Sequence, residues 1–443
     1  MNKLHPIRRL RRAWSRLYGT AAERVRRFSR HTDEVLTEEP IDFSAPSIPY
    51  YENLANRLSF VRVVLYMVLL VFVVVTVISN HTLITYENLY YLAKDIGAAT
   101  LTAQSRADTV SYPISSAGSD FSLFRGGLAI AGSEVVTVMS GSGRQTLSVN
   151  VSYADPCVRA SDKYCLTFGR GENSFAVYNS FAQVHGETTA FPVYEASVAN
   201  DGSFAVVTRS RDYTSEILLY DGDLHPVAAL HLNGYCVGLA FNPEGDRLGI
   251  VSVEAVEGVW ETRITMVRIE NRISEESVIL SGRFGQACAF LSGDRMAVIF
   301  SDGLMIFKTD ATVVGEAAFT GTTPTLCAFG GGQVAILAET DADLSEDILT
   351  VYDRNGRTVY TLLLDTAHPI RRKGGATHLS LEGGVLFIRA GDTLFRLSDN
   401  GDTLAHSAVS RDSLDILPLG DGEVLVCTPA YAYRLEGADF KKD

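Results

Sequence analysis

The chain has 443 residues, 46% of them hydrophobic, and carries 52 Asp+Glu against 39 Lys+Arg. The acids are concentrated beyond residue 62, where 45 Asp+Glu face 27 Lys+Arg, and this balance excludes nucleic acid as the partner of that part. The six cysteines include no C-x-x-C pair, so the spacing typical of a zinc or redox site is absent and no metal or cofactor is expected.

Residues 1–30 form a basic segment with one apolar stripe. Its apolar residues recur every three or four positions, namely Leu10, Trp14, Leu17, Ala21, Val25 and Phe28. Nine arginines surround or flank this stripe, against one acid, Glu23. The pattern predicts an amphipathic helix on the anionic inner leaflet of a membrane. Two alternatives stay open: an arginine-rich tail that only sets topology, because Gly19 interrupts the helix, and a weak nucleic-acid contact through arginine alone.

Residues 31–59 read as a flexible linker, because they turn acidic, contain proline and have few large apolar side chains. Residues 60–79 then predict a transmembrane helix. Residues 63–78 hold no charge, no Gly and no Pro, and 20 helical residues span about 30 Å, the thickness of the hydrocarbon core. The head before this segment is too long for a cleaved signal peptide, and no A-x-A pattern follows, so we expect an uncleaved signal anchor. A buried core helix is the alternative.

Charge around the apolar segment predicts its orientation. Residues 1–62 carry 12 Lys+Arg, whereas no Lys or Arg follows the segment until Lys94. The positive-inside rule therefore places the N-terminus in the cytoplasm and the C-terminal part outside the cell. Residues 80–107 are predicted to form a stalk, with a short helix capped by Thr85 and then a tether of small and polar residues.

Residues 108–437 show repeats of short apolar strands separated by Gly, Asp, Asn and Ser turns. The strongly apolar strands recur at intervals of 36 to 51 residues and start near Leu128, Tyr164, Phe204, Leu248, Met296, Val334, Val385 and Val424. Four strands in about 40 residues are typical of a β-propeller blade. The preceding strands (ASVA, VGLAF, ACAF, LCAF) are made of small residues, as crowding at a ring axis requires. We therefore predict an all-β, eight-bladed β-propeller.

Two features of the repeats bear on blade number and closure. Residues 157–190 form a degenerate unit, so seven blades is the main alternative, and a β-sandwich is a weaker one. The last unit supplies three strands before the chain nearly ends. We expect residues 108–114 to add the missing outer strand and close the ring.

Segments such as FNPEGDRLGIVS and VYDRNGRTVYTLLL resemble the strands of WD40 and YVTN-type repeats, although the Trp-Asp dipeptide of WD40 is missing. The order of basic head, single span, ENLYYLAKDI stalk and propeller is similar to an uncharacterised clostridial family of membrane-anchored propeller proteins. The resemblance implies the fold and a location on the outer face of a single plasma membrane. It implies no activity.

Motifs for catalysis are missing. There is no H-E-x-x-H, G-x-S-x-G or P-loop pattern, and the nine histidines are scattered. The chain has two tryptophans, Trp14 and Trp260, which excludes the repeated Trp motifs of propeller-type quinone dehydrogenases and sialidases. Cys157 and Cys165 flank a hairpin and are a candidate disulfide. Cys288 and Cys327 occupy equivalent places in their units and are expected to be small core residues.

Two inserted turns are candidate contact sites for a partner. One carries Arg371, Arg372 and Lys373 on an otherwise acidic domain, and the other carries Trp260, either as an exposed anchor or packed under its own loop. The first hypothesis is a non-catalytic membrane protein whose propeller binds a protein, peptide or glycan at the outer face of the cell membrane. An enzyme with a site in the axial funnel, which converging His, Asp and Glu would favour, and a transmembrane sensor are the alternatives.

Overall fold

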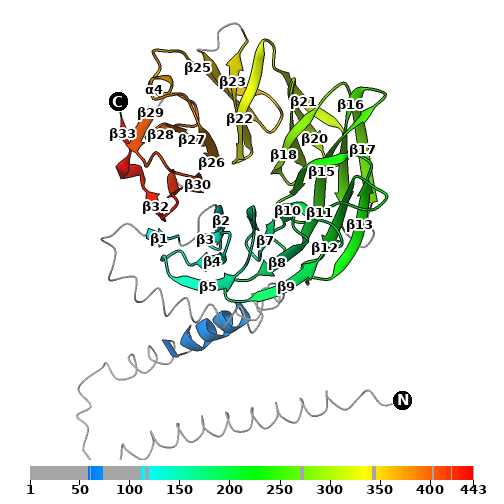
Figure 1. Cartoon of the computed structure of the whole chain (residues 1–443). Coiled ribbons are helices and arrows are strands. Elements are labelled where there is room, and N and C mark those ends of the chain that lie inside the picture. Colours follow the sequence, from blue (N-terminus) through cyan, green and yellow to red (C-terminus); the bar gives the residue numbers. More distant parts are fainter. Residues whose placement is uncertain are drawn as a thin grey trace, which may run out of the picture. The chain divides into compact units, whose positions relative to one another are not determined.

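The computed structural model describes residues 58–59, 61–72, 111–114, 119–269, 274–341, 346–401, 404–420 and 422–442. From residue 111 onward the chain forms eight antiparallel sheets arranged as a ring (Figure 1). Seven sheets have four strands and one has five. The protein is therefore an eight-bladed β-propeller, as predicted, and the seven-blade and sandwich alternatives are wrong.

We number the blades 1 to 8 by their inner strands in chain order. In blades 1 to 7 the strands follow chain order from the axis outward, whereas blade 8 takes its outer strand from the start of the propeller. The inner strands are β2 (Asp120–Phe124), β6 (Pro156–Ala160), β10 (Val193–Val198), β14 (Tyr235–Phe241), β18 (Gly285–Ser292), β22 (Thr322–Gly330), β26 (His378–Glu382) and β30 (Asp415–Gly420). The second strands are β3 (Gly127–Ala131), β7 (Cys165–Gly169), β11 (Phe204–Thr208), β15 (Arg247–Val256), β19 (Arg295–Phe300), β23 (Gln333–Thr340), β27 (Val385–Ala390) and β31 (Glu423–Cys427). These second strands coincide with the eight predicted apolar strands.

The remaining strands complete the blades. The third strands are β4 (Val135–Met139), β8 (Ser174–Tyr178), β12 (Ser215–Tyr220), β16 (Val259–Arg268), β20 (Gly303–Lys308), β24 (Asp347–Asp353), β28 (Thr393–Leu397) and β32 (Tyr431–Leu435). The outer strands are β5 (Gln145–Asn150), β9 (Gln183–Thr188), β13 (Pro226–Leu232), β17 (Ser274–Ser281), β21 (Val313–Ala318), β25 (Thr358–Leu364), β29 (Leu404–Ala408) and β1 (Ser111–Pro113). The unit expected to be degenerate is a regular four-stranded blade, β6 to β9.

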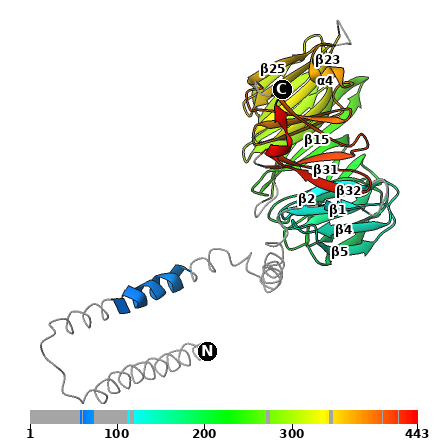
Figure 2. The ribbon, with the colours of Figure 1, turned by 90° about the vertical axis from the view of Figure 1, so that its left-hand side faces the viewer.

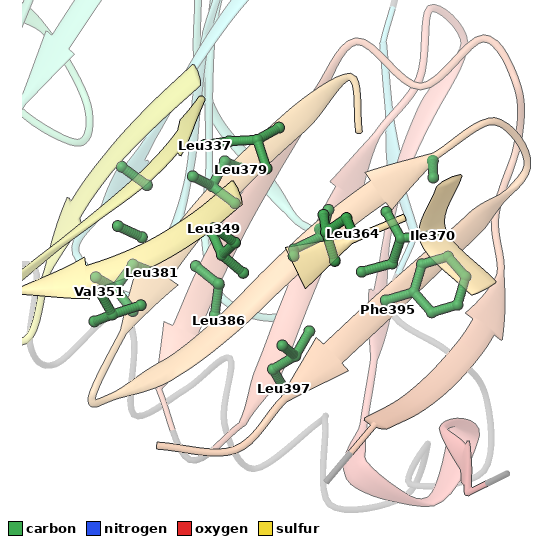
Figure 3. Close-up of a cluster of buried hydrophobic side chains, with 14 residues drawn as sticks. Leu337, Leu349, Val351, Leu364, Ile370, Leu379, Leu381, Leu386, Phe395 and Leu397 are labelled. Atoms are coloured by element: carbon green, nitrogen blue, oxygen red, sulfur yellow. The ribbon is translucent and has the colours of Figure 1, made fainter. Parts of the chain in front are cut away.

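The hydrophobic core lies between blades rather than at one centre. Eight clusters of buried side chains each combine residues from two neighbouring blades. Figure 3 shows the cluster in which Leu349 of blade 6 packs near Leu386 of blade 7. A second strand is covered on both faces by such clusters, so β3, β7 and β11 are buried along their whole length. This explains their predominantly apolar sequences.

Close packing of the inner strands demands small residues, as expected. A Cβ added to Gly238 would lie 2.7 Å from the Sγ of Cys288 on the next inner strand, so a side chain there has no room. Cys288 is half-buried at this contact. Cys327, expected to be a core residue, is exposed instead.

The ring is closed by the N-terminal strand of the propeller. β1 pairs antiparallel with β32, with Ser111 opposite Tyr433 and Pro113 opposite Tyr431 (Figures 1 and 2). Tyr112, between them, is buried in the cluster that joins blades 8 and 1, and its hydroxyl donates to the carbonyl oxygen of Gly141 at 3.3 Å. The predicted closure by residues 108–114 is confirmed for this strand.

The C-terminus is attached to blade 7. After a 3-10 turn, η1 (Gly437–Asp439), the buried Phe440 packs near Phe387, and β33 (Lys441–Lys442) adds a fifth strand beside β29. The propeller therefore extends beyond residue 437, where the sequence predicted its end. Phe440 and the short strand explain why the last residues form part of the ring.

Residues 61–72 form a helix whose side chains are all exposed. Within the described part of the chain, no helix combines the length and the apolar character needed to cross a membrane. The rest of the predicted segment 60–79 lies outside the described residues. The predicted amphipathic helix at 1–30, most of the linker at 31–59 and the stalk at 80–107 also lie outside them.

Candidate functional site

The two faces of the propeller differ in what they present. In every blade the four strands from the axis outward are antiparallel, so the fourth strand ends on the face where the inner strand begins, and a short connection leads to the next inner strand. We call this the upper face. It also carries the turns between second and third strands.

One level of the ring near the upper face is polar over half of its circumference. Strand pairing places one inner-strand residue of each blade at this level: Asp120 (opposite Ala131), Cys157 (Phe168), Glu195 (Val207), Gly238 (Val251), Ala287 (Ile299), Leu326 (Leu337), His378 (Arg389) and Asp415 (Cys427). Blades 4 to 6 contribute small or apolar residues, whereas blades 7, 8, 1 and 3 contribute titratable ones. With Arg159, the residues Asp120, Glu195, His378 and Asp415 form what we call the polar arc.

Arg159 links three blades within the polar arc. Its Nη1 lies 3.2 Å from Oδ2 of Asp120 in blade 1, and its Nη2 lies 2.8 Å from Oε1 of Glu195 in blade 3. All three side chains are about one-third exposed, each at 34%. The guanidinium therefore neutralises carboxylates on both sides of its own strand, close to solvent.

His378 and Asp415 form the other end of the polar arc. The Nε2 of His378 lies 3.5 Å from Oδ1 of Asp415, which also accepts from the backbone N–H of Ile416 at 2.7 Å. Burial lowers the pKa of His378 and raises the pKa of Asp415 above the usual carboxyl value. The imidazole is therefore neutral at pH 7 and can accept or donate one hydrogen bond.

Exposed aromatic side chains gather at the upper face. In the described part of the propeller, these are Tyr194, Tyr213, Tyr235, Trp260 and Tyr431. Tyr213 lies in a loop of the upper face, and each of the others lies near the first residue of a strand that begins at this face. Four of them, which we call the aromatic patch (Tyr194, Tyr213, Tyr235 and Trp260), belong to blades 3 and 4. Tyr194 and Tyr235 also line a 240 Å³ hollow between these blades.

Trp260 is exposed, as one of the two sequence alternatives predicted. It is 50% accessible, and its ring packs edge-on against Phe284 with centroids 5.3 Å apart. The expected inserted turn is instead a continued hairpin: β15 and β16 pair as far as Val256 and Val259. Only Glu257 and Gly258 form the turn, both with positive φ, as a two-residue type I′ connection requires.

The predicted basic loop is a short helix, α4 (Pro369–Arg372), and its three cations have different roles. Nη1 of Arg371 lies 2.6 Å from Oδ2 of Asp347, a buried carboxylate of blade 6. Arg372 and Lys373 are exposed. Arg371 is therefore a structural residue rather than a contact residue, because its charge faces inward.

The predicted Cys157–Cys165 disulfide is not formed, and both thiols are free. The register places Ala160, not Cys157, opposite Cys165. Because side chains alternate along a strand, the two cysteines project to opposite faces of blade 2 and join different core clusters. Burial raises the pKa of Cys157 to about 11 and that of Cys165 to about 12, so both stay protonated at neutral pH.

The chemistry that these groups support is recognition by hydrogen bonds, ion pairs and aromatic contact. Among the described residues there is no group of three or more His, Cys, Asp or Glu side chains able to hold a metal ion. Cys236, beside the aromatic patch, has its pKa raised to about 12 by burial and is a poor nucleophile.

The polar arc could not be found from the sequence, because its members are 36 or more residues apart along the chain and meet only through blade register. The available signal was the position of the three acids and the histidine at or near the start of an inner strand, a signal that Arg159 does not share. Asp120, His378 and Asp415 are first residues of their strands.

Comparison with known proteins gives a family. The model of a family described as "Family of unknown function (DUF5711)" matches residues 104–430. No curated protein matches the chain. Among solved structures, the β-propeller domain of Myceliophteria thermophila Cps50 (Swd1) is 14% identical, with 69% of this chain and 99% of that chain covered and a TM-score of 0.42. Kluyvelomyces marxianus Hsv2 is 11% identical, with 69% and 100% covered and a TM-score of 0.43. Kuenenia stuttgartiensis hydrazine synthase is 13% identical, with 65% and 93% covered and a TM-score of 0.41.

Proposed function

The chain belongs to the DUF5711 family of unknown function, and on this premise we propose that it is a non-catalytic protein that binds a protein, peptide or glycan through the upper face of its propeller. The observation that carries the proposal is the distribution of exposed aromatic side chains, which in the described propeller all lie on this face. Aromatic residues are enriched in binding surfaces because they bury large areas at low entropic cost. Within the described propeller, most of the exposed aliphatic residues belong instead to outer strands, such as Val313 and Leu363.

We further propose that residues 60–79 anchor this head at the outer face of the cell membrane, with the N-terminus in the cytoplasm and the stripe from Leu10 to Phe28 on the inner leaflet. Three observations support this placement: the apolar run at 63–78, the excess of Lys and Arg before it, and the exposure of every side chain at 61–72. The resemblance to clostridial anchored propellers agrees with it. Proteinase K added to intact cells should then remove the propeller and spare an N-terminal tag; a propeller that resists until lysis contradicts the placement.

Site-specific photo-cross-linking tests the binding face. A photoreactive phenylalanine analogue replaces Trp260 or Tyr235 in the full chain, expressed in its native cell. We expect a discrete cross-linked species from both positions, because a bound partner covers the aromatic patch.

The matched controls are Val313 and Leu363, which are apolar and exposed on outer strands. They should give no discrete species. Equal yields from upper-face and outer-strand positions, or none from Trp260 and Tyr235, contradict the proposal.

The polar arc favours a second candidate, an axial site that converts a small polar molecule. Burial of His378 and Asp415 perturbs both pKa values, as catalytic sites require. In that case the full chain should consume one component of a whole-cell metabolite extract, and Asp415→Asn should abolish this turnover while cross-links at Trp260 persist. If the metabolite extract has the same composition after incubation with and without the protein, the enzyme candidate is contradicted.

A further inference from the structure

A hollow of 510 Å³ lies on the upper face, lined by residues of blade 7 and by the connections before and after it. It is lined by Arg372, Lys373, Arg389, Gly391, Asp392 and Arg411, and we call it the basic groove. Four cations and one acid meet here, although the whole chain has a net charge of −13. Such a local reversal of charge indicates attraction for an anionic ligand.

The α4 side of the basic groove is rigidly attached to the propeller core. Ile370 is fully buried and lies beside Phe395 in the cluster between blades 6 and 7 (Figure 3). Arg371 is ion-paired with the buried Asp347. These two anchors fix the helix, so Arg372 and Lys373 are presented from a defined position.

The turn after β27 fixes the spacing across the groove. Gly391 has a φ of +59°, and a Cβ added to it would lie 2.7 Å from the carbonyl oxygen of Lys373. Only glycine therefore allows the turn to approach the end of α4 this closely.

Arg389 and Arg411 form the far side of the groove. Arg389 donates from Nη1 to the carbonyl oxygen of Ser413 at 2.5 Å and from Nη2 to that of Arg411 at 2.6 Å. These bonds hold the connection between blades 7 and 8 in place, with the Arg411 side chain 83% exposed. Arg389 also lies opposite His378, so the basic groove adjoins the polar arc.

Asp392 shows how the groove accommodates a carboxylate. Its Oδ1 lies 3.3 Å from Nζ of Lys373, and its Oδ2 lies 3.4 Å from Nη2 of Arg411. The two cations on opposite walls thus already hold one carboxylate between them. Arg372 and Arg389 supply positive charge beyond what Asp392 neutralises.

We propose that the basic groove binds carboxylate side chains of an acidic peptide segment, an assignment that rests on the proposed function and names the ligand class for this part of the upper face. A carboxylate is the favoured group because Lys373 and Arg411 already hold one, that of Asp392, between them. Cations on separate elements match several carboxylates in a row, and guanidinium groups pair with carboxylates in bidentate geometry.

Fluorescence anisotropy with defined peptides tests this assignment. The full chain in nanodiscs is titrated against labelled octa-glutamate and octa-glutamine at about 0.15 M salt, where charges more than about 8 Å away are screened. We expect octa-glutamate to bind and octa-glutamine not to bind. The double charge reversal R372E/R411E should weaken octa-glutamate binding about tenfold, because it replaces attraction by repulsion at both walls.

The matched control is R354E/R357E, a double reversal of exposed arginines in the turn between β24 and β25 on the opposite face. It changes the net charge by the same amount and should leave the affinity within about twofold. The tenfold loss expected of R372E/R411E corresponds to about 1.4 kcal/mol and is clearly larger. Equal losses in both double variants, or no preference for octa-glutamate over octa-glutamine, overturn the proposal. Displacement of octa-glutamate by millimolar inorganic phosphate or by a DNA oligonucleotide would also overturn it, in favour of a phosphate site.

The cross-linking result separates this proposal from the function on which it rests. If R372E/R411E fails to weaken octa-glutamate binding while cross-links at Trp260 persist, the groove assignment is wrong and the binding face stands. If octa-glutamate binding depends on the groove but no upper-face cross-links form, the groove assignment stands and the proposed function is wrong.

Discussion

Replacing Tyr112 by alanine should lower the free energy of unfolding by about 3 kcal/mol, the cost of truncating a large buried aromatic side chain. Tyr112 belongs to the short strand that closes the ring, where it faces the buried Ala432 and packs between blades 8 and 1. Its loss weakens both the closing strand and the last interface between blades. Urea denaturation of the full chain, followed by fluorescence, measures the change.

Tyr431→Ala is the control for this prediction. Tyr431 lies at the start of the neighbouring strand, opposite Pro113, but its side chain is exposed. Its truncation should change stability by less than about 0.5 kcal/mol, as for most surface positions. Similar losses in the two variants would show that the closing strand does not join blades 8 and 1 in the way described.

The fold could be predicted from the sequence because each second strand is buried on both faces. This burial makes the central residues of the strands near Phe204, Met296 and Val334 consecutively apolar, so these strands stand out from the alternating strands around them. Counting them gave eight blades. Closure followed from the last unit, which lacks an outer strand for Tyr431–Leu435 to pair with.

The candidate site could not be predicted, because it depends on register and on long-range pairing. Asp120 and Asp415 are 295 positions apart in the chain, yet they occupy equivalent positions in the inner strands of adjacent blades. The same limitation explains the failed disulfide. A hairpin centred on Ser161 would bring Cys157 and Cys165 together, but the observed pairing shifts the partner by three residues and reverses the face.

The basic segment shows the limit of reading charge along a chain. Arg371, Arg372 and Lys373 are consecutive, which predicts one exposed contact site. The buried Ile370 packs on the core and holds the segment as a short helix. In this geometry Arg371 points inward to Asp347, whereas Arg372 and Lys373 lie in the basic groove. The sequence could not show that Asp347, 24 residues earlier, needs a cation.

Arg371→Leu should destabilise the protein by about 3 kcal/mol at neutral pH, because it leaves the carboxylate of Asp347 buried without its cation. Asp347 has only 5% of its side chain exposed, and its burial raises its pKa above the usual carboxyl value even beside Arg371. Without the guanidinium this pKa rises further. The folded state of the variant then binds a proton more tightly than the unfolded chain, so its stability falls as pH increases above about 4, the carboxyl pKa of an unfolded chain.

Denaturation at pH 4.5 and pH 7.5 therefore separates the loss of a charge partner from the loss of packing. If the charge of Asp347 is responsible, the difference between Arg371→Leu and the natural protein is smaller at pH 4.5, and adding Asp347→Asn recovers much of the loss at pH 7.5. A difference that is independent of pH and unaffected by Asp347→Asn would mean that Arg371 contributes through its methylene chain alone. Arg372→Leu, which removes the adjacent exposed cation, should leave stability within about 0.5 kcal/mol at both pH values, because surface charges contribute little.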